Sequence, residues 1–294
     1  MSYFIVTDST CDLSVDQLKQ LNVGRAPLIA NFQDGRALDD GFSEMDAHTF
    51  YEGMRSGMVS TTSQVNSSTF YDMFKLALAD YDNVLYIGFS SELSGTFQSA
   101  FLAKNTLEED DPALAGRIVL IDSRAASLGE GLLVLEACKK RDEGMNFAEL
   151  CSYIESIKLN LNHWFTVDDL VYLKRGGRVS SIAATMGALL NIKPVLHINN
   201  EGKLVPVSKV KGRKKAIVTL VDRFREMYDP AMGKDFVIGH GDCLAEAEGL
   251  KNTLLKEFDL NSPTVEPLGM VIGSHAGPGT ICLCFFGKPR EDFN

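Results

Sequence analysis

Three short apolar runs in the first half of the chain end in loops rich in hydroxyl and carboxylate side chains. Residues 3–7 are followed by Asp-Ser-Thr, residues 83–87 by the loop 88–96, and residues 117–121 by Asp-Ser-Arg. Each run is short enough for a buried strand, and an amphipathic helix pattern follows each loop. This alternation predicts an α/β fold built on a mainly parallel sheet that is flanked by helices.

The polar loops are expected at one edge of that sheet, because parallel strands place their carboxyl ends together and ligands bind there. The loop 88–96 opens a helix, whose first turn has unpaired N–H groups and a partial positive charge. Ser94 and Thr96 add hydroxyls, and Gly95 allows a ligand to approach the backbone. This combination can hold a carboxylate or a phosphate. The alternative is that Ser94 only caps the helix.

Composition excludes several classes of partner. The chain has 294 residues, of which 45% are hydrophobic and 23% charged, as in globular proteins with a sizeable core. The net charge of -10 and the lack of a basic block argue against nucleic acid and anionic membrane surfaces as partners. No apolar run approaches the ~20 residues of a membrane span, and the first residues do not resemble a signal peptide.

The six cysteines form no CxxC pair, which favours reduced thiols and a cytoplasmic location. Cys282 and Cys284 share one face of an expected strand, but no histidine is close in sequence, so we expect no metal.

The second half is expected to form a separate α/β domain with a mixed sheet. A polar stretch at residues 158–162 divides the chain into domains of residues 1–160 and 161–294. The strands expected in the second domain cover residues 163–167, 192–198, 203–208, 235–239 and 280–286. Two helices are expected over 180–190 and 214–228, and a third follows residues 240–242 and ends at 258.

Two segments read as loops because they lack apolar periodicity. Residues 60–64 are Ser-Thr-Thr-Ser-Gln, and residues 273–279 are rich in glycine and contain His275. His275 beside Gly-Pro-Gly is either a donor in a pocket or a surface residue in a turn. Arg175 and Arg178 flank two glycines. They either bind a phosphoryl group or an acidic partner, or belong to a loop that is simply solvated.

Common enzyme signatures are absent: the sequence has no GxGxxG, GxxxxGK[ST], HExxH or GxSxG motif. Taken together, however, six segments resemble the DegV family in order and spacing over essentially the whole chain. These segments are residues 8–10, 62–64, 90–96, 121–124, 173–178 and 273–279. One departure is Val65-Asn66, where the family pattern has Pro-Ser; the loss of proline changes the stiffness of the chain there.

The resemblance implies a two-domain α/β protein that binds one long-chain, palmitate-like fatty acid between its domains and needs no other cofactor. It implies that the carboxylate is held by Thr62, Ser94 and His275. Ser63, Gly95 and Thr96 are expected to support these loops. Two hydroxyls and a helix N-terminus can compensate a buried carboxylate without a buried arginine.

By the same resemblance, the protein presents the acid to a separate fatty acid kinase that makes an acyl phosphate, and Arg175 and Arg178 face that kinase. The helix expected over 182–190 either leaves room for the acyl tail or is ordinary close packing. Two other functions stay open: a hydrolase or transferase with Ser94 as nucleophile and His275 as base, and a sugar or dihydroxyacetone-type phosphotransfer module.

Overall fold

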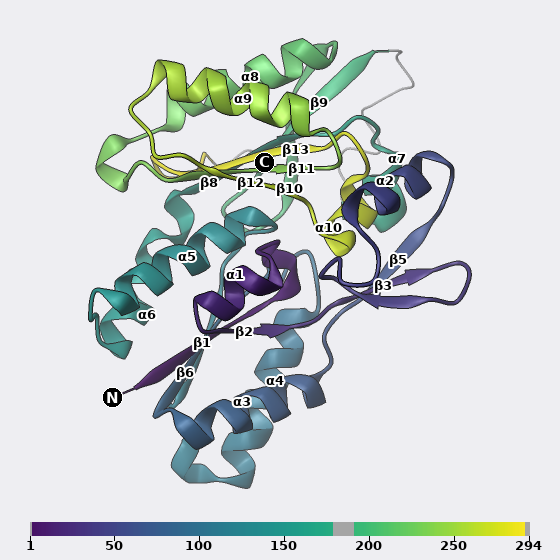
Figure 1. Ribbon diagram of the computed structural model, residues 1–294. Coiled ribbons are helices and arrows are strands. Elements are labelled where there is room, and N and C mark those ends of the chain that lie inside the picture. The colour runs from purple at the N-terminus through teal and green to yellow at the C-terminus, as the bar shows by residue number, and fades with distance from the viewer. Residues whose placement is uncertain (1, 179–190, 292–294) are drawn as a thin grey trace.

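The computed structural model describes residues 2–178 and 191–291 (Figure 1). Its first sheet is parallel throughout and has the strand order β2-β1-β6-β7. The strands are β1 (Tyr3–Asp8), β2 (Val23–Ala26), β6 (Asn83–Gly88) and β7 (Ile118–Asp122). The predicted parallel sheet is therefore confirmed. The edge strand β2 was not predicted from the sequence.

Helices cover both faces of this sheet, as the alternating pattern predicts. On one face lie α3 (Ser67–Asp80) and α4 (Thr96–Asp110), which bury Phe70 and Phe74 against Tyr86 of β6. On the other face lie α1 (Val15–Gln20), α5 (Leu128–Asp142) and α6 (Phe147–Ile157). Helix α1 begins with a capping box, in which the side chains of Ser14 and Gln17 each accept a hydrogen bond from the other residue's backbone N–H.

The second sheet is mixed and has the order β10-β9-β8-β13-β11-β12. Only β11 and β12 pair in parallel, and the other neighbours are antiparallel. Helices α8 (Arg213–Met227) and α9 (Leu244–Glu257) cover its outer face. The strands are β8 (Leu161–Thr166), β9 (Ile192–Ile198), β10 (Leu204–Lys211), β11 (Phe236–His240), β12 (Thr264–Pro267) and β13 (Ile281–Phe286).

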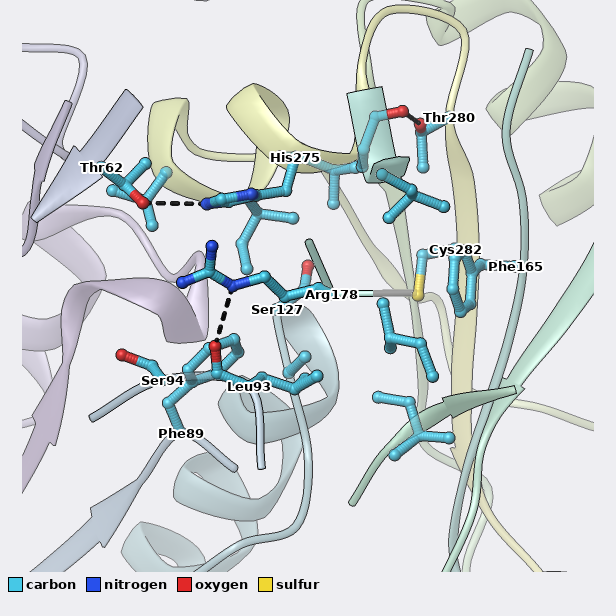
Figure 2. A pocket seen from close by; sticks show the side chains of 18 of the residues that line it. Thr62, Phe89, Leu93, Ser94, Ser127, Phe165, Arg178, His275, Thr280 and Cys282 are labelled. Carbon is cyan, nitrogen blue, oxygen red and sulfur yellow. Dashed lines mark hydrogen bonds between the residues drawn. The ribbon is translucent and has the colours of Figure 1, made fainter. Parts of the chain in front are cut away.

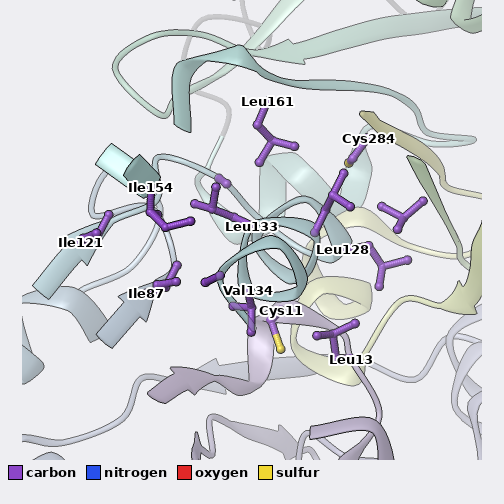
Figure 3. Close-up of a cluster of buried hydrophobic side chains, with 14 of the residues drawn as sticks. Cys11, Leu13, Ile87, Ile121, Leu128, Leu133, Val134, Ile154, Leu161 and Cys284 are labelled. Atoms are coloured by element: carbon purple, nitrogen blue, oxygen red, sulfur yellow. The ribbon is translucent and has the colours of Figure 1, made fainter. Parts of the chain in front are cut away.

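Helix α5 is the layer between the two sheets (Figure 3). Its buried residues Leu128 and Leu133 belong to one cluster with Ile87 of the parallel sheet and Cys284 of the mixed sheet. A helix that is apolar on most of its circumference is one that other elements enclose. Because a single core spans both sheets, the division of the chain at residue 160 stays a prediction.

A third, antiparallel sheet of order β4-β3-β5 lies beside the other two. Its strands are β3 (Ile29–Phe32), β4 (Ala37–Asp39) and β5 (Ser60–Ser63). A turn at Asp34-Gly35 joins β3 to β4, and Gly35 has the left-handed φ of +88°. Against this sheet pack α2 (Ala47–Arg55) and α10 (Met270–Ala276); α7 (Val171–Gly176) contacts α10.

Two predicted loops are wrong, and both concern the site. Residues 60–63 form strand β5, whose Thr62 pairs with Ala30 of β3. A polar edge strand carries no apolar alternation, so the sequence gives no sign of it. His275 lies in the last turn of α10 rather than in a loop. The helix expected over 180–190 lies outside the described residues.

Within residues 2–178 and 191–291, no helix combines the length and hydropathy required to cross a membrane.

Candidate functional site

A cavity lies where the three sheets meet, and its two ends differ in chemistry (Figure 2). Thr62, Ser94, Arg178 and His275 lie at one end, while Phe165 lies at the other. The empty volume is about 960 Å³, which includes space open to solvent. The apolar lining residues are Leu28, Phe89, Leu93, Ala126, Phe165, Leu173, Ile198, Leu204, Leu268, Val271, Ile272, Ala276 and Cys282.

Thr62 and His275 contact each other directly. The Thr62 hydroxyl Oγ1 lies 2.8 Å from His275 Nε2. The same strand and helix are joined a second time, because the hydroxyls of Ser60 and Ser274 are 2.6 Å apart. Side chains alternate along a strand, so Thr62 points to the cavity while Ser63 bonds Asn31 at the exposed side of β3. Ser63 therefore does not line the cavity.

His275 is a neutral side chain at physiological pH. Burial, and secondly the positive charge of Arg178, lowers the pKa of His275 from its ordinary value to about 4. Its second ring nitrogen, Nδ1, is buried and has no hydrogen-bond partner among residues 2–178 and 191–291. It faces Gly176, where a Cβ atom would lie only 2.1 Å from Nδ1. A neutral ring that donates from Nε2 would leave the Thr62 hydroxyl hydrogen free to point at a ligand.

Ser94 lies just before α4 and lines the cavity. Its Oγ accepts a hydrogen bond from Thr96 N at 3.2 Å and lies 2.9 Å from Thr96 Oγ1. The cap residue of α4 is Gly95, which makes no side-chain cap bond. A Cβ on Gly95 would lie 2.3 Å from Gln64 Oε1, so the glycine lets the end of β5 approach α4. The loop and the strand thus converge on the cavity.

Arg178 lines the cavity and is also exposed to solvent. Its Nε donates to the carbonyl of Leu93 at 3.2 Å, and the guanidinium also bonds the carbonyl of Gly176. In Figure 2 the guanidinium lies between the Thr62–His275 pair and Ser94. The polar end therefore has a cation in addition to its hydroxyls. Arg175 is exposed and lies over the ring of Tyr172 at 5.8 Å.

Ser127 is a cavity residue that sequence reasoning missed. It is buried, it precedes α5, and its backbone has the rare combination φ 55°, ψ -150°. Non-glycine residues hold such a conformation only where their surroundings impose it. The Ser127 hydroxyl donates to Asp12 at 2.5 Å. Its position after an apolar strand and before a helix is the same signal that identified Ser94.

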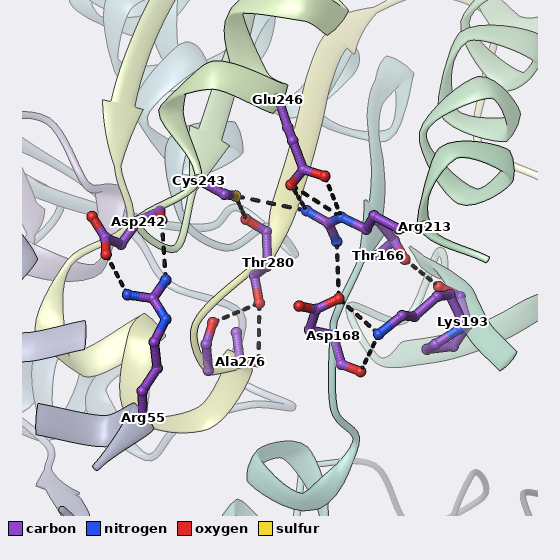
Figure 4. A network of polar contacts seen from close by, with 12 residues as sticks. Arg55, Thr166, Asp168, Lys193, Arg213, Asp242, Cys243, Glu246, Ala276 and Thr280 are labelled. Carbon is purple, nitrogen blue, oxygen red and sulfur yellow. Dashed lines mark hydrogen bonds and ion pairs between the residues drawn. The ribbon is translucent and has the colours of Figure 1, made fainter. Parts of the chain in front are cut away.

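One surface cluster in the described part of the chain has the side chains of a cation site. Ligand atoms of His48, Glu52 and Asp242 all lie within 4.8 Å of one another. Arg55 already donates to Glu52 at 2.6 Å. It also donates to Asp242 at 2.5 Å, as Figure 4 shows. The positive charge that these carboxylates require is therefore supplied by the protein, and the cluster ties α2 to the loop after β11.

Comparison with known proteins gives one consistent result. The family model for uncharacterised proteins of the DegV family matches residues 2–288. A DegV domain-containing protein of Clostridium perfringens is 38% identical over 98% of this chain and 99% of its own. A fatty acid-binding protein of Thermotoga maritima is 35% identical over 96% of both chains. The solved structure of a fatty acid-binding DegV family protein from Thermus thermophilus is 34% identical and has a TM-score of 0.84; the match covers 98% of this chain and 100% of that one. With matches over nearly its full length, this chain belongs to the DegV family.

Proposed function

We propose that the protein binds one long-chain, palmitate-like fatty acid, and that it is a carrier rather than an enzyme. The observation that carries the proposal is the cavity with Thr62, Ser94, Arg178 and His275 at one end and a mostly apolar wall elsewhere. Relatives from Thermotoga maritima and Thermus thermophilus carry fatty acid binding in their names. The carboxylate binds Thr62 and Ser94, with His275 beside it, and the tail extends toward Phe165.

Elementary energetics favour such a ligand. About 15 methylenes at ~0.8 kcal/mol each gain on the order of 12 kcal/mol on leaving water. This is an upper figure, because association and ordering oppose it. The carboxylate opposes binding, since burying an unpaired charge costs several kcal/mol. Two hydroxyls, the N-terminus of α4 and the nearby Arg178 guanidinium can offset that cost.

Two measurements test this proposal. Mass spectrometry of the freshly purified, denatured protein should find a palmitate-sized acid; a sample without lipid that also takes up none contradicts it. Replacing both Thr62→Ala and Ser94→Ala should weaken palmitate binding by ~2–4 kcal/mol, at ~1–2 kcal/mol for each hydrogen bond to a charged group. Ser63→Ala is the matched control, because this neighbour on β5 points away from the cavity. Equal affinity of all three proteins would refute the head-group assignment.

The geometry favours binding over hydrolysis or acyl transfer. A serine nucleophile requires a base within hydrogen-bond reach. The partner of Ser94 Oγ is Thr96, whereas His275 Nε2 bonds Thr62. A serine-reactive phosphonate should therefore not label Ser94, and labelling would favour the enzyme. The mostly apolar lining likewise disfavours a sugar or dihydroxyacetone-type ligand.

We also propose that a separate fatty acid kinase receives the bound acid and makes an acyl phosphate, in the cytoplasm. Arg178 lines the polar end of the cavity, and both Arg178 and Arg175, three residues before it, are exposed to a partner. All six cysteines are free thiols, which supports a reducing compartment and a role in fatty acid metabolism or lipid transport there. With such a kinase and ATP, Arg175→Ala should lower acyl phosphate formation and leave palmitate affinity unchanged; unchanged formation would refute this contact.

A further inference from the structure

Two carboxylates meet at the start of α10, the helix that carries His275. Asp12 Oδ1 accepts a hydrogen bond from Gly269 N at 3.0 Å, and Asp40 Oδ1 accepts one from Val271 N at 2.9 Å. A Cβ on Gly269 would lie 2.6 Å from the first oxygen and 2.7 Å from the second. Both acids are thus packed against the same backbone unit, although one follows β1 and the other follows β4.

The remaining oxygens of the two acids are also bonded. Asp12 Oδ2 accepts from the hydroxyl of the strained cavity residue Ser127 at 2.5 Å. Asp40 Oδ2 accepts from the Ser9 hydroxyl at 3.2 Å, and the backbone carbonyl of Asp40 accepts from Arg25 at 2.6 Å. The acid pair therefore ties two walls of the cavity, α10 and the start of α5, to the parallel sheet.

Helix α10 depends on such external bonds for its orientation. It has only seven residues, and helices of this length are not stable on their own. At its other end, the Thr280 hydroxyl donates to the carbonyls of Ala276 at 3.0 Å and Gly277 at 2.9 Å (Figure 4). Contacts at both ends therefore set where His275 lies relative to Thr62.

Burying Asp12 and Asp40 side by side costs free energy of folding, which argues for a role beyond packing. Burial raises the pKa of Asp40 to about 7. Burial, and secondly the charge of Asp40, raises the pKa of Asp12 well above its ordinary value. Two carboxylates held this way stabilise a fold less than apolar residues of the same size would. Their hydrogen bonds to the α10 backbone are what apolar residues could not replace.

We propose that Asp12 and Asp40 are positioning residues for the head-group site: by fixing the N-terminus of α10, they hold His275 against Thr62. This inference rests on the proposed fatty acid binding, but its first consequence concerns the empty protein and can be observed without lipid.

The experiment compares four full-length proteins: wild type, Asp40→Ala, Asp40→Asn and Glu130→Ala. Glu130 is the matched control, because it is an equally buried acid that bonds Thr7 and Thr10 and makes no hydrogen bond to α10. Asparagine keeps an oxygen for Val271 N, so it should rescue what alanine loses. The readouts are the ring ¹⁵N signals of His275 without ligand, assigned with His275→Gln, and palmitate affinity by titration.

Asp40→Ala should shift the His275 ring signals and weaken palmitate binding about tenfold, the effect of losing one hydrogen bond to a charged group. Asp40→Asn should restore the His275 ring signals and the palmitate affinity. Glu130→Ala should lower thermal stability but leave these two readouts unchanged. Unshifted His275 signals in Asp40→Ala, or an equal shift in Glu130→Ala, would overturn the proposal. If Asp40→Ala does not fold, Asp40→Ser, whose side chain is too short to reach Val271 N, replaces it. Failure of the wild type to bind palmitate would refute the proposed function alone, since the ring signals still decide the positioning role.

Discussion

The polar end of the cavity combines one fixed cation with groups that are neutral near pH 7. Arg178 carries the charge, while Thr62, Ser94 and the buried ring of His275 supply hydrogen bonds. His275 lies beside the proposed carboxylate site, so its protonation depends on whether a carboxylate is bound there. A bound carboxylate favours the protonated ring and raises its pKa from the low value of the empty protein.

Palmitate affinity should therefore rise as the pH falls below neutrality. The pKa of His275 is about 4 in the empty protein, so filling the site takes up protons wherever the pH lies between that value and the higher pKa of the complex. Titrations at pH 5.5, 6.5 and 7.5 of wild type and His275→Gln separate this effect from the titration of palmitate itself. Parallel pH profiles for the two proteins would contradict the assignment.

Gly176 should be required for binding because of its contact with His275. An added Cβ would lie 2.1 Å from His275 Nδ1, so Gly176→Ala must displace the ring from Thr62 and should weaken palmitate binding several-fold to tenfold. Gly249→Ala in α9 is the control, since no side chain or other segment of the described residues lies within 4 Å of the added carbon. That control should leave binding unchanged and stabilise the helix by ~1 kcal/mol. Wild-type affinity in Gly176→Ala would show that the ring position is unimportant.

At the scale of elements, apolar periodicity decided what could be predicted. The parallel sheet, strands β9 and β10, and helices such as α8 follow directly from the spacing of apolar residues. Strand β5 could not be predicted, because its Ser-Thr-Thr-Ser sequence is polar and pairs with β3 through the backbone. Helix α10 is short and glycine-containing, and long-range bonds to Asp12 and Asp40 hold it.

The same limit applies to the candidate site. Thr62, Ser94 and His275 were named through their family resemblance, and the structure brings all three to one cavity. Ser127 and the acid pair were missed, since their roles depend on contacts between residues more than 100 positions apart.

The turn after β1 is tied to α5 by the buried acid Glu130, and this bond should leave a signature in stability. Burial, and secondly the charge of Asp8, raises the pKa of Glu130 well above its ordinary value of 4.5. Its contribution to the free energy of unfolding is complete below pH 4.5 and is lost as the pH rises through the folded-state pKa. Each pH unit between the ordinary and the folded-state pKa of Glu130 lowers the free energy of unfolding by up to about 1.4 kcal/mol.

Glu130→Gln should therefore gain stability relative to wild type between pH 5 and pH 8, as measured by urea unfolding at several pH values. Exposed Glu109→Gln on α4 is the control and should track the wild type throughout. A constant difference between Glu130→Gln and wild type over this range would show that the acid titrates normally.

At the scale of the whole molecule, α5 makes the two large sheets dependent on one core. Leu133 is fully buried in the cluster that reaches both of them. Leu133→Ala should lower the free energy of unfolding by about 2–5 kcal/mol. Hydrogen exchange followed by mass spectrometry should show earlier opening of β6 and β13 together. The control Leu76→Ala, at an exposed position on α3, should change the free energy of unfolding little. Loss of exchange protection in only one of the two sheets in Leu133→Ala would argue that the sheets unfold independently.

The contact between Thr62 and His275 joins residues 213 positions apart, and β13 lies beyond both in the chain. A polypeptide still emerging from the ribosome has the threonine long before it has the histidine, and it lacks the central strand of the mixed sheet until the end. Under the proposed function, a fatty acid can therefore be bound only after both of these residues and β13 have been synthesised.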